Sequence, residues 1–151
     1  MLTTVIAAYA ALLSTVSVGW GIYSWHRTHK TRVRVNLTNA MIPLALGGIQ
    51  DVISIEVVNE SDHTVRVTGF GLMANDGSGQ QLFFIGPVPG SSLPGQIPPH
   101  DSGTGLNDWS GLVGAPINFN LPVKAFAVLA SGERVYSKPV TLYIPKQLRA
   151  A

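Results

Sequence analysis

The chain has 151 residues, of which 46% are hydrophobic and 12% are charged, and its formal net charge is +2. This length allows one ordinary domain, and the charged share is about half of the usual value, which is low for a freely soluble protein. The chain has no cysteine, which excludes disulfides, thiolate metal sites and thiol nucleophiles.

The first segment, LTTVIAAYAALLSTVSVGWGIYSW from Leu2 to Trp25, contains no charged residue. A bilayer core of about 30 Å requires about 20 helical residues, and a soluble helix of this length would show a polar stripe. A cleavable signal peptide would need a basic start and a shorter apolar run, and neither is present. We therefore predict an uncleaved transmembrane helix over residues 1–26.

Aromatic and basic residues mark the end of this span. No Lys or Arg precedes it and four follow within ten positions, so the positive-inside rule places the N-terminus outside and the domain in the cytoplasm, at an inner or cytoplasmic-type membrane. A basic segment over 27–34 would then lie against anionic headgroups and lead into the first strand. The predicted membrane-interface residues are Trp20, Tyr23, Trp25, Arg27, Lys30, Arg32 and Arg34.

The same four cations carry the positive charge of the whole chain. Without them six basic residues face eight carboxylates, a balance of −2. A nucleic-acid-binding domain would need a basic stripe on its folded face, so nucleic acid is excluded as a predicted partner.

One face of the predicted helix carries only small residues. At 100° per residue they fall within one narrow sector, with bulky side chains such as Val5, Tyr9 and Val16 opposite. Small residues at this spacing let helix backbones approach closely in lipid. The predicted helix-packing residues are Thr3, Ala7, Ala10, Ser14, Ser17 and Gly21. No ionisable residue interrupts the span, which argues against an ion or proton path.

Beyond Thr31 the hydrophobic period changes to two. Alternation over 31–38, 51–59 and 64–73, and further short apolar runs over 80–85, 123–130 and 140–144, are separated by turn-forming residues. Seven or so short strands without a helical pattern predict an all-β antiparallel sandwich over 35–151. The rhythm is similar to that of immunoglobulin-like domains, but it lacks their Cys-Trp-Cys signature.

A Pro/Gly-rich segment, GPVPGSSLPGQIPPHDSGTG over residues 86–105, separates these strands. Loops this long are usually functional or disordered, so we predict either a contact arm or a surface crossover between two sheets. The residues predicted to contact a partner are Pro87, Pro89, Pro94, Pro98, Pro99 and Trp109. Trp109 would pack either on the core or on the partner.

No catalytic motif is present, since the chain lacks phosphate-loop, nucleophile-elbow and zinc-protease patterns. The pair His26 and His29 is better explained as interfacial residues than as metal ligands. His100-Asp101 has no nucleophile placed beside it, and the calcium-loop-like segment 75–78 is better explained as a turn. We predict no enzymatic activity, no cofactor and no metal.

These features predict a non-catalytic accessory subunit of a larger membrane complex, whose partners are integral membrane subunits and the bilayer. Photosynthetic and respiratory assemblies contain small anchored subunits of this kind, which is an analogy only. One alternative is a membrane-tethered sandwich that binds a peptide or ligand at its loops or at a strand edge. Another is a pilin-type filament subunit. Arg27 argues against it, because a basic residue at this position would interrupt the helical core of the filament.

Overall fold

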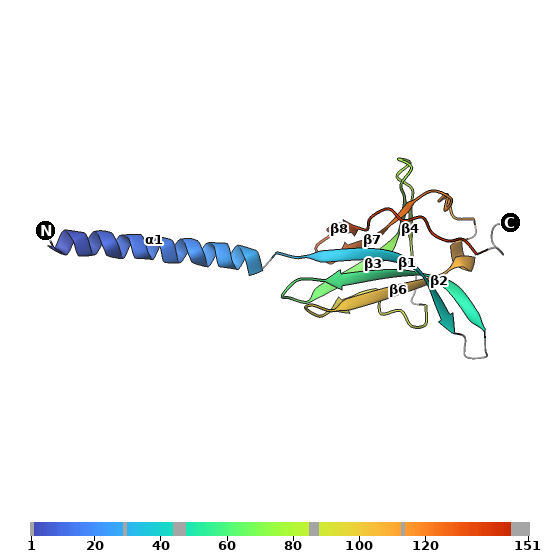
Figure 1. The fold of residues 1–151 in the computed structure, drawn as a ribbon, viewed down its shortest axis with the longest axis horizontal. Coiled ribbons are helices and arrows are strands. Elements are labelled where there is room, and N and C mark those ends of the chain that lie inside the picture. The colour runs from blue at the N-terminus through green and yellow to red at the C-terminus, as the bar shows by residue number, and fades with distance from the viewer. Residues whose placement is uncertain (1, 29, 44–47, 85–87, 113, 146–151) are drawn as a thin grey trace. The chain divides into compact units, whose positions relative to one another are not determined.

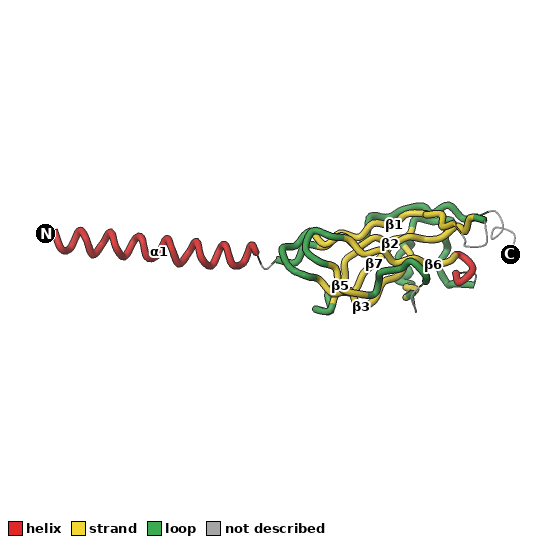
Figure 2. Tube along the Cα trace, turned by 90° about the horizontal axis from the view of Figure 1, so that it is seen from below, coloured by secondary structure: helices red, strands yellow, loops and turns green. Residues whose placement is uncertain are grey.

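The computed structural model describes residues 2–28, 30–43, 48–84, 88–112 and 114–145, and within its helix the side chains of 5–7 and 9–25. The chain forms two compact units, Met1–Thr31 and Arg32–Ala151. The first unit is a helix and the second consists of antiparallel β-sheets (Figure 1, Figure 2). The chain is therefore mostly β with one N-terminal apolar helix, as predicted.

The helix α1 (Leu2–Thr28) is a single run of 27 residues. It contains no proline, and its two glycines lie near its end, so nothing in its interior breaks the backbone hydrogen-bond ladder. Its segment Val5–Trp25 is long and apolar enough to cross a membrane, by length and composition. The predicted span of 1–26 agrees with the helix to within two residues.

The β-unit consists of two antiparallel sheets. The first sheet has the order β1-β2-β6 and the second has β4-β3-β7-β8, with β5 also paired to β3. The strands are β1 (Val33–Pro43), β2 (Ile49–Asn59), β3 (Val65–Ala74), β4 (Gln81–Phe83), β5 (Gly95–Ile97), β6 (Ser102–Asp108), β7 (Val123–Leu129) and β8 (Arg134–Tyr136). A short 3-10 helix, η1 (Trp109–Leu112), follows β6.

The core lies between the inward faces of the two sheets. Val35 and Leu37 of β1 are buried while Arg34 between them is exposed, which is the pattern that alternation predicted. Phe70 of β3 reaches across to β6, where a Cβ placed on Gly105 would overlap its ring. The two sheets therefore touch closely enough that only glycine fits at position 105.

The sequence placed most strands correctly, but it missed two. The segment predicted as a loop over 86–105 contains β5 and the start of β6, and Leu93 and Ile97 within it are buried. Gly and Pro are depleted in sheets, so their abundance in this segment predicted a loop and not a strand. At the other end, the run 140–144 forms only an isolated bridge, from Val140 to Val123.

Candidate interaction sites

The predicted helix-packing residues lie on a helix whose described side chains are all exposed. Every described side chain of α1 is exposed, including Ala7, Ala10, Ser14, Ser17 and Gly21, while the side chain of Thr3 lies outside the described set. The Ser17 hydroxyl donates to the carbonyl of Leu13 at 2.9 Å, so this polar group is satisfied within its own helix. A continuous side of the helix is available for contact.

The predicted interface aromatics lie together near the end of α1. The ring centroids of Trp20 and Tyr23 are 6.1 Å apart, and Trp20, Tyr23 and Trp25 are each more than half exposed. Rings with one apolar and one polar part suit the headgroup layer. The three rings are therefore exposed and do not pack into a core.

The predicted basic cluster is divided between the two units. Lys30 is exposed in the first unit, and the side chain of Arg27 lies outside the described set. Arg32 belongs to the β-unit, where its N–H donates to the hydroxyl oxygen of Ser61 at 2.7 Å. Arg34 lies on β1, and its guanidinium is 3.0 Å from the carboxylate of Glu60. β1 begins at Val33, so the last two residues of the predicted segment 27–34 lie in the first strand.

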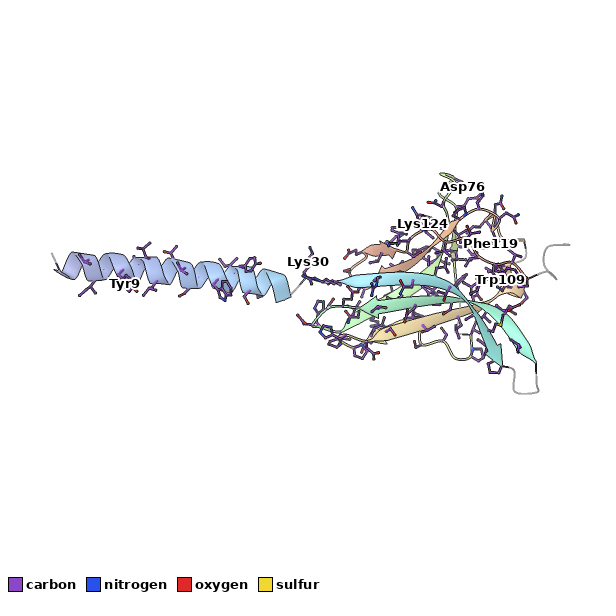
Figure 3. The ribbon with its side chains drawn as sticks, viewed as in Figure 1. Tyr9, Lys30, Asp76, Trp109, Phe119 and Lys124 are labelled. Carbon is purple, nitrogen blue, oxygen red and sulfur yellow. The ribbon has the colours of Figure 1, made fainter. Side chains whose placement is uncertain are left out.

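The predicted contact loop is only partly exposed. Trp109 is buried in η1 and packs edge-on against Phe119, with the ring centroids 5.6 Å apart (Figure 3). Of the two roles that the sequence left open, it takes the packing on the core. Its indole Nε1 has no hydrogen-bond partner among the described residues. The prolines at 89, 94, 98 and 99 are exposed, and Pro87 lies outside the described residues.

The histidine considered as a base is paired with a different carboxylate. His100 Nε2 lies 3.0 Å from Asp62 Oδ1 in the turn after β2, whereas Asp101 accepts a bond from the N–H of Ser102. Both members of the His100–Asp62 pair are about two-thirds exposed, so water screens the interaction. His26 and His29 lie outside the described side chains. Among the residues that are described, no cluster of three or more His, Asp or Glu forms a metal site.

Residues 75–78 form a turn between β3 and β4, as predicted. The N–H of Ser78 donates to Asp76 Oδ1 at 2.8 Å, and Gly77 has a φ of 82°, which glycine adopts without strain. The hydrogen bonds from the Ser78 side chain and N–H lower the pKa of Asp76 below its ordinary value. The residues of the turn are exposed to solvent, Asp76 among them (Figure 3).

A groove lies between the two sheets, and the hydrophobic alternation in the sequence did not predict it. It has a volume of about 600 Å³ and is lined mostly by the edge strands β1 and β8 with the residues that follow β8. The lining residues are Val33, Arg34, Val35, Asn36, Leu37, Thr38, Glu56, Val135, Tyr136, Ser137, Lys138 and Val140. We call this the edge groove. Hydrophobic alternation predicts which side chains turn inward, but not which strand lies at an edge.

A second exposed feature lies where β1 and β2 extend beyond β6. β1 pairs with β2 as far as Pro43, whereas β6 pairs only with Val52–Val58 of β2. The end of this two-stranded ribbon is apolar, with Met41 and Ile49 each more than two-thirds exposed. No described residue of the β-unit covers these two side chains.

Comparison with known proteins does not assign a family. No protein-family model matches the chain, and no curated protein matches it significantly. One similar solved structure is described as "X-ray structure of Northeast Structural Genomics Consortium target SoR45". It is 15% identical, covers 80% of this chain and 92% of its own, and aligns with a TM-score of 0.37. A score this low carries no argument about fold or function.

Proposed function

We propose that this protein is a non-catalytic accessory subunit of a larger membrane protein complex. The observation that carries this proposal is a 27-residue helix with every described side chain exposed, next to a β-unit that closes its own core. A long exposed apolar helix is unfavourable in water but favourable in lipid. The helix is therefore an anchor, and its small-residue side is the surface that docks on neighbouring helices.

The proposed orientation places the β-unit in the cytoplasm, at an inner or cytoplasmic-type membrane. It rests on the basic residues that follow the span, with none before it. We also propose an immunoglobulin-like sandwich for the β-unit. The division into β1-β2-β6 and β4-β3-β7-β8 supports it, because immunoglobulin-like domains divide their A-B-E and C-F-G strands in the same way.

Native electrophoresis of membranes solubilised in a mild detergent tests the accessory role. The wild-type chain is expected to migrate within an assembly much larger than itself. The double variant Ser14→Leu/Gly21→Leu is expected to insert normally but to run mostly apart from the assembly, because added side chains block close helix approach. A wild-type chain that migrates alone would contradict the proposal.

A matched control keeps this test specific. The double variant Val5→Leu/Val16→Leu also adds apolar volume to α1, but on the side opposite the small residues. It is expected to stay in the assembly. If both variants dissociate equally, the effect comes from the size of the helix and not from its small-residue face.

The alternative function, a membrane-tethered peptide-binding module, is favoured by one specific observation, the edge groove. Ligand sites are concave and mostly apolar, with volumes of about 300–1,000 Å³, and the groove of about 600 Å³ lies within that range. Binding of a partner at this groove is compatible with an accessory subunit, since both roles hold another protein at the membrane.

A further inference from the structure

The edge groove contains backbone groups that have no hydrogen-bond partner among the described residues, and the alternation of the β1–β2 ladder determines which ones. Glu60 donates its N–H to the Arg32 carbonyl at 2.8 Å, whereas Asn59 donates its N–H away from β1, to Asp101 on the β6 side, at 2.9 Å. Residues opposite each other in an antiparallel pair alternate between bonded and non-bonded. Arg34, Asn36 and Thr38 therefore bond to β2, and the backbone groups between them point outward.

The outward groups belong to Val33, Val35 and Leu37. β1 pairs with β2 alone, and no hydrogen bond from any described residue reaches these outward N–H and C=O groups. Their side chains still serve the core, since Val35 and Leu37 are buried. The edge thus presents alternating donors and acceptors over an apolar base, at a spacing of about 6.8 Å.

The edges of β6, β4 and β8 are covered or short. On β6 the outward carbonyl of Thr104 accepts from the N–H of Ser92 at 2.8 Å. β4 and β8 are three residues long, and β8 is followed by Lys138 and Pro139, with a register that slips by one residue before Val140. Short strands, lysine, proline and bulges are the devices that protect edges from pairing.

At the start of the second half of β1, the Asn39 side chain donates to the carbonyl of Tyr143 at 2.8 Å. The edge groove lies along the first half, residues 33–38. A lipid or a small molecule does not offer alternating backbone donors and acceptors, whereas an extended polypeptide does.

We propose that a partner protein adds an extended segment to β1 at residues 33–38 as an extra antiparallel strand. This proposal rests on the proposed function as an interaction subunit and names the chemistry of its partner. Alternate side chains of the segment pack toward Val135 and Val140, so those positions are apolar. The others face Arg34, Asn36 and Thr38.

The charges at the rim specify an acidic segment. Glu60 forms an ion pair with Arg34, and Glu56 accepts a hydrogen bond from the Asn36 amide at 3.0 Å. Lys138 has no carboxylate within ion-pair distance in the part of the chain that is described. A second copy of this chain would bring the same cation, Lys138, to the contact, whereas a segment with Asp or Glu complements it.

A phage-displayed library of random dodecapeptides, selected on the full chain in lipid nanodiscs, tests this proposal. Enriched peptides are expected to alternate apolar with polar residues and to carry an acid. The Val35→Pro variant should bind them at least about tenfold more weakly, because it removes an outward N–H without touching the bonds to β2. Lys138→Glu should also weaken binding, and more so at low salt.

A second measurement does not depend on whether Val35→Pro folds. The best peptide is synthesised with N-methyl groups at its odd positions or at its even positions. A strand added at one edge uses only alternate N–H groups, so one version should bind and the other should not. Equal binding of both versions, or no enriched peptide, overturns the proposal.

Amide hydrogen exchange distinguishes the occupants. The amides of Val33, Val35 and Leu37 should exchange faster than those of Arg34, Asn36 and Thr38 in the chain alone, and should become protected when the peptide binds. Protection that rises with protein concentration without peptide would assign the edge to a second copy and overturn the proposal. Peptide binding by a chain that runs as a lone monomer on native electrophoresis would overturn the accessory role and leave this inference standing.

Discussion

Asn59 shows how one buried polar residue ties the turns of the β-unit together. It is fully buried, and its amide nitrogen shares its two hydrogens among the carbonyls of His63, Ile97 and Pro98, at 2.8, 3.1 and 2.9 Å. Its Oδ1 accepts from the N–H of Ser61 at 3.0 Å. One side chain thus satisfies four backbone groups in the segments around β2, β3 and β5, and alternation alone predicted none of these bonds.

Asn59→Ala is therefore expected to destabilise the β-unit by about 3 kcal/mol, because several buried backbone groups lose their partners. Calorimetric unfolding of the full chain in detergent micelles measures this change. The control Asn118→Ala removes an exposed amide that accepts one local bond from Asn120, and it should change stability by less than about 0.5 kcal/mol. Equal effects from the two variants would contradict the role of Asn59.

A second prediction at this scale concerns the pH dependence at Asp76. Its folded pKa lies below 3.8 because Ser78 donates to the carboxylate from its side chain and its N–H. A depressed folded pKa means that Asp76 contributes stability above its unfolded pKa, and this contribution is lost as the pH falls through the folded pKa. Removing the hydroxyl with Ser78→Ala should raise the pKa of Asp76 toward 3.8.

Carboxyl chemical shifts, followed by NMR titration, measure this change. Asp108 provides an internal control in the same spectra. Burial raises the pKa of Asp108, but hydrogen bonds from Ser110, Gln50 and the Trp109 backbone outweigh it and lower the pKa overall. Ser78→Ala should leave Asp108 unchanged, and an unmoved Asp76 would show that the hydroxyl does not determine its pKa.

At the scale of single elements, the sequence predicted the helix better than it predicted the strands. A charge-free run of 24 residues predicts one long helix, because a helix satisfies its backbone hydrogen bonds within a single segment. The strands depend on partners far along the chain. β6 follows a Pro/Gly-rich stretch and has two glycines of its own, and it forms because its inward positions face Phe70 and its ladder faces β2.

The flank of α1 leads to a prediction about membrane orientation. Changing Arg27, Lys30, Arg32 and Arg34 to Gln removes the positive charge that follows the span, so part of the population should insert with the β-unit outside. A C-terminal phosphatase reporter, active only outside the cytoplasm, should then gain activity. The control changes Arg66, Lys124, Arg134 and Lys138 to Gln, which removes the same charge from the β-unit, and should leave the reporter silent. Reporter activity in the wild-type chain would contradict the proposed orientation.

At the scale of the whole molecule, the chain divides between Thr31 and Arg32 into two units. All of the described buried core residues lie in the second unit. A chain that begins at Arg32 is therefore expected to fold in buffer without detergent, because it loses no core contact. Amide NMR spectra should superimpose on those of the full chain except near the new terminus. Poor dispersion, or a non-cooperative unfolding transition, would show that the β-unit depends on the helix.

The sequence by itself determined the apolar helix, its aromatic and basic end, and the inward faces of most strands, because these follow from composition and from local hydrophobic period. Only the tertiary structure decided that Trp109 is buried, that His100 meets Asp62, and that β5 and β6 lie within the Pro/Gly-rich stretch. The open edge at Val33, Val35 and Leu37 belongs to the same group. The physical reason is that the order of strands in a sheet determines which backbone groups stay unpaired. That order depends on contacts between residues far apart in the chain, which no local sequence pattern predicts.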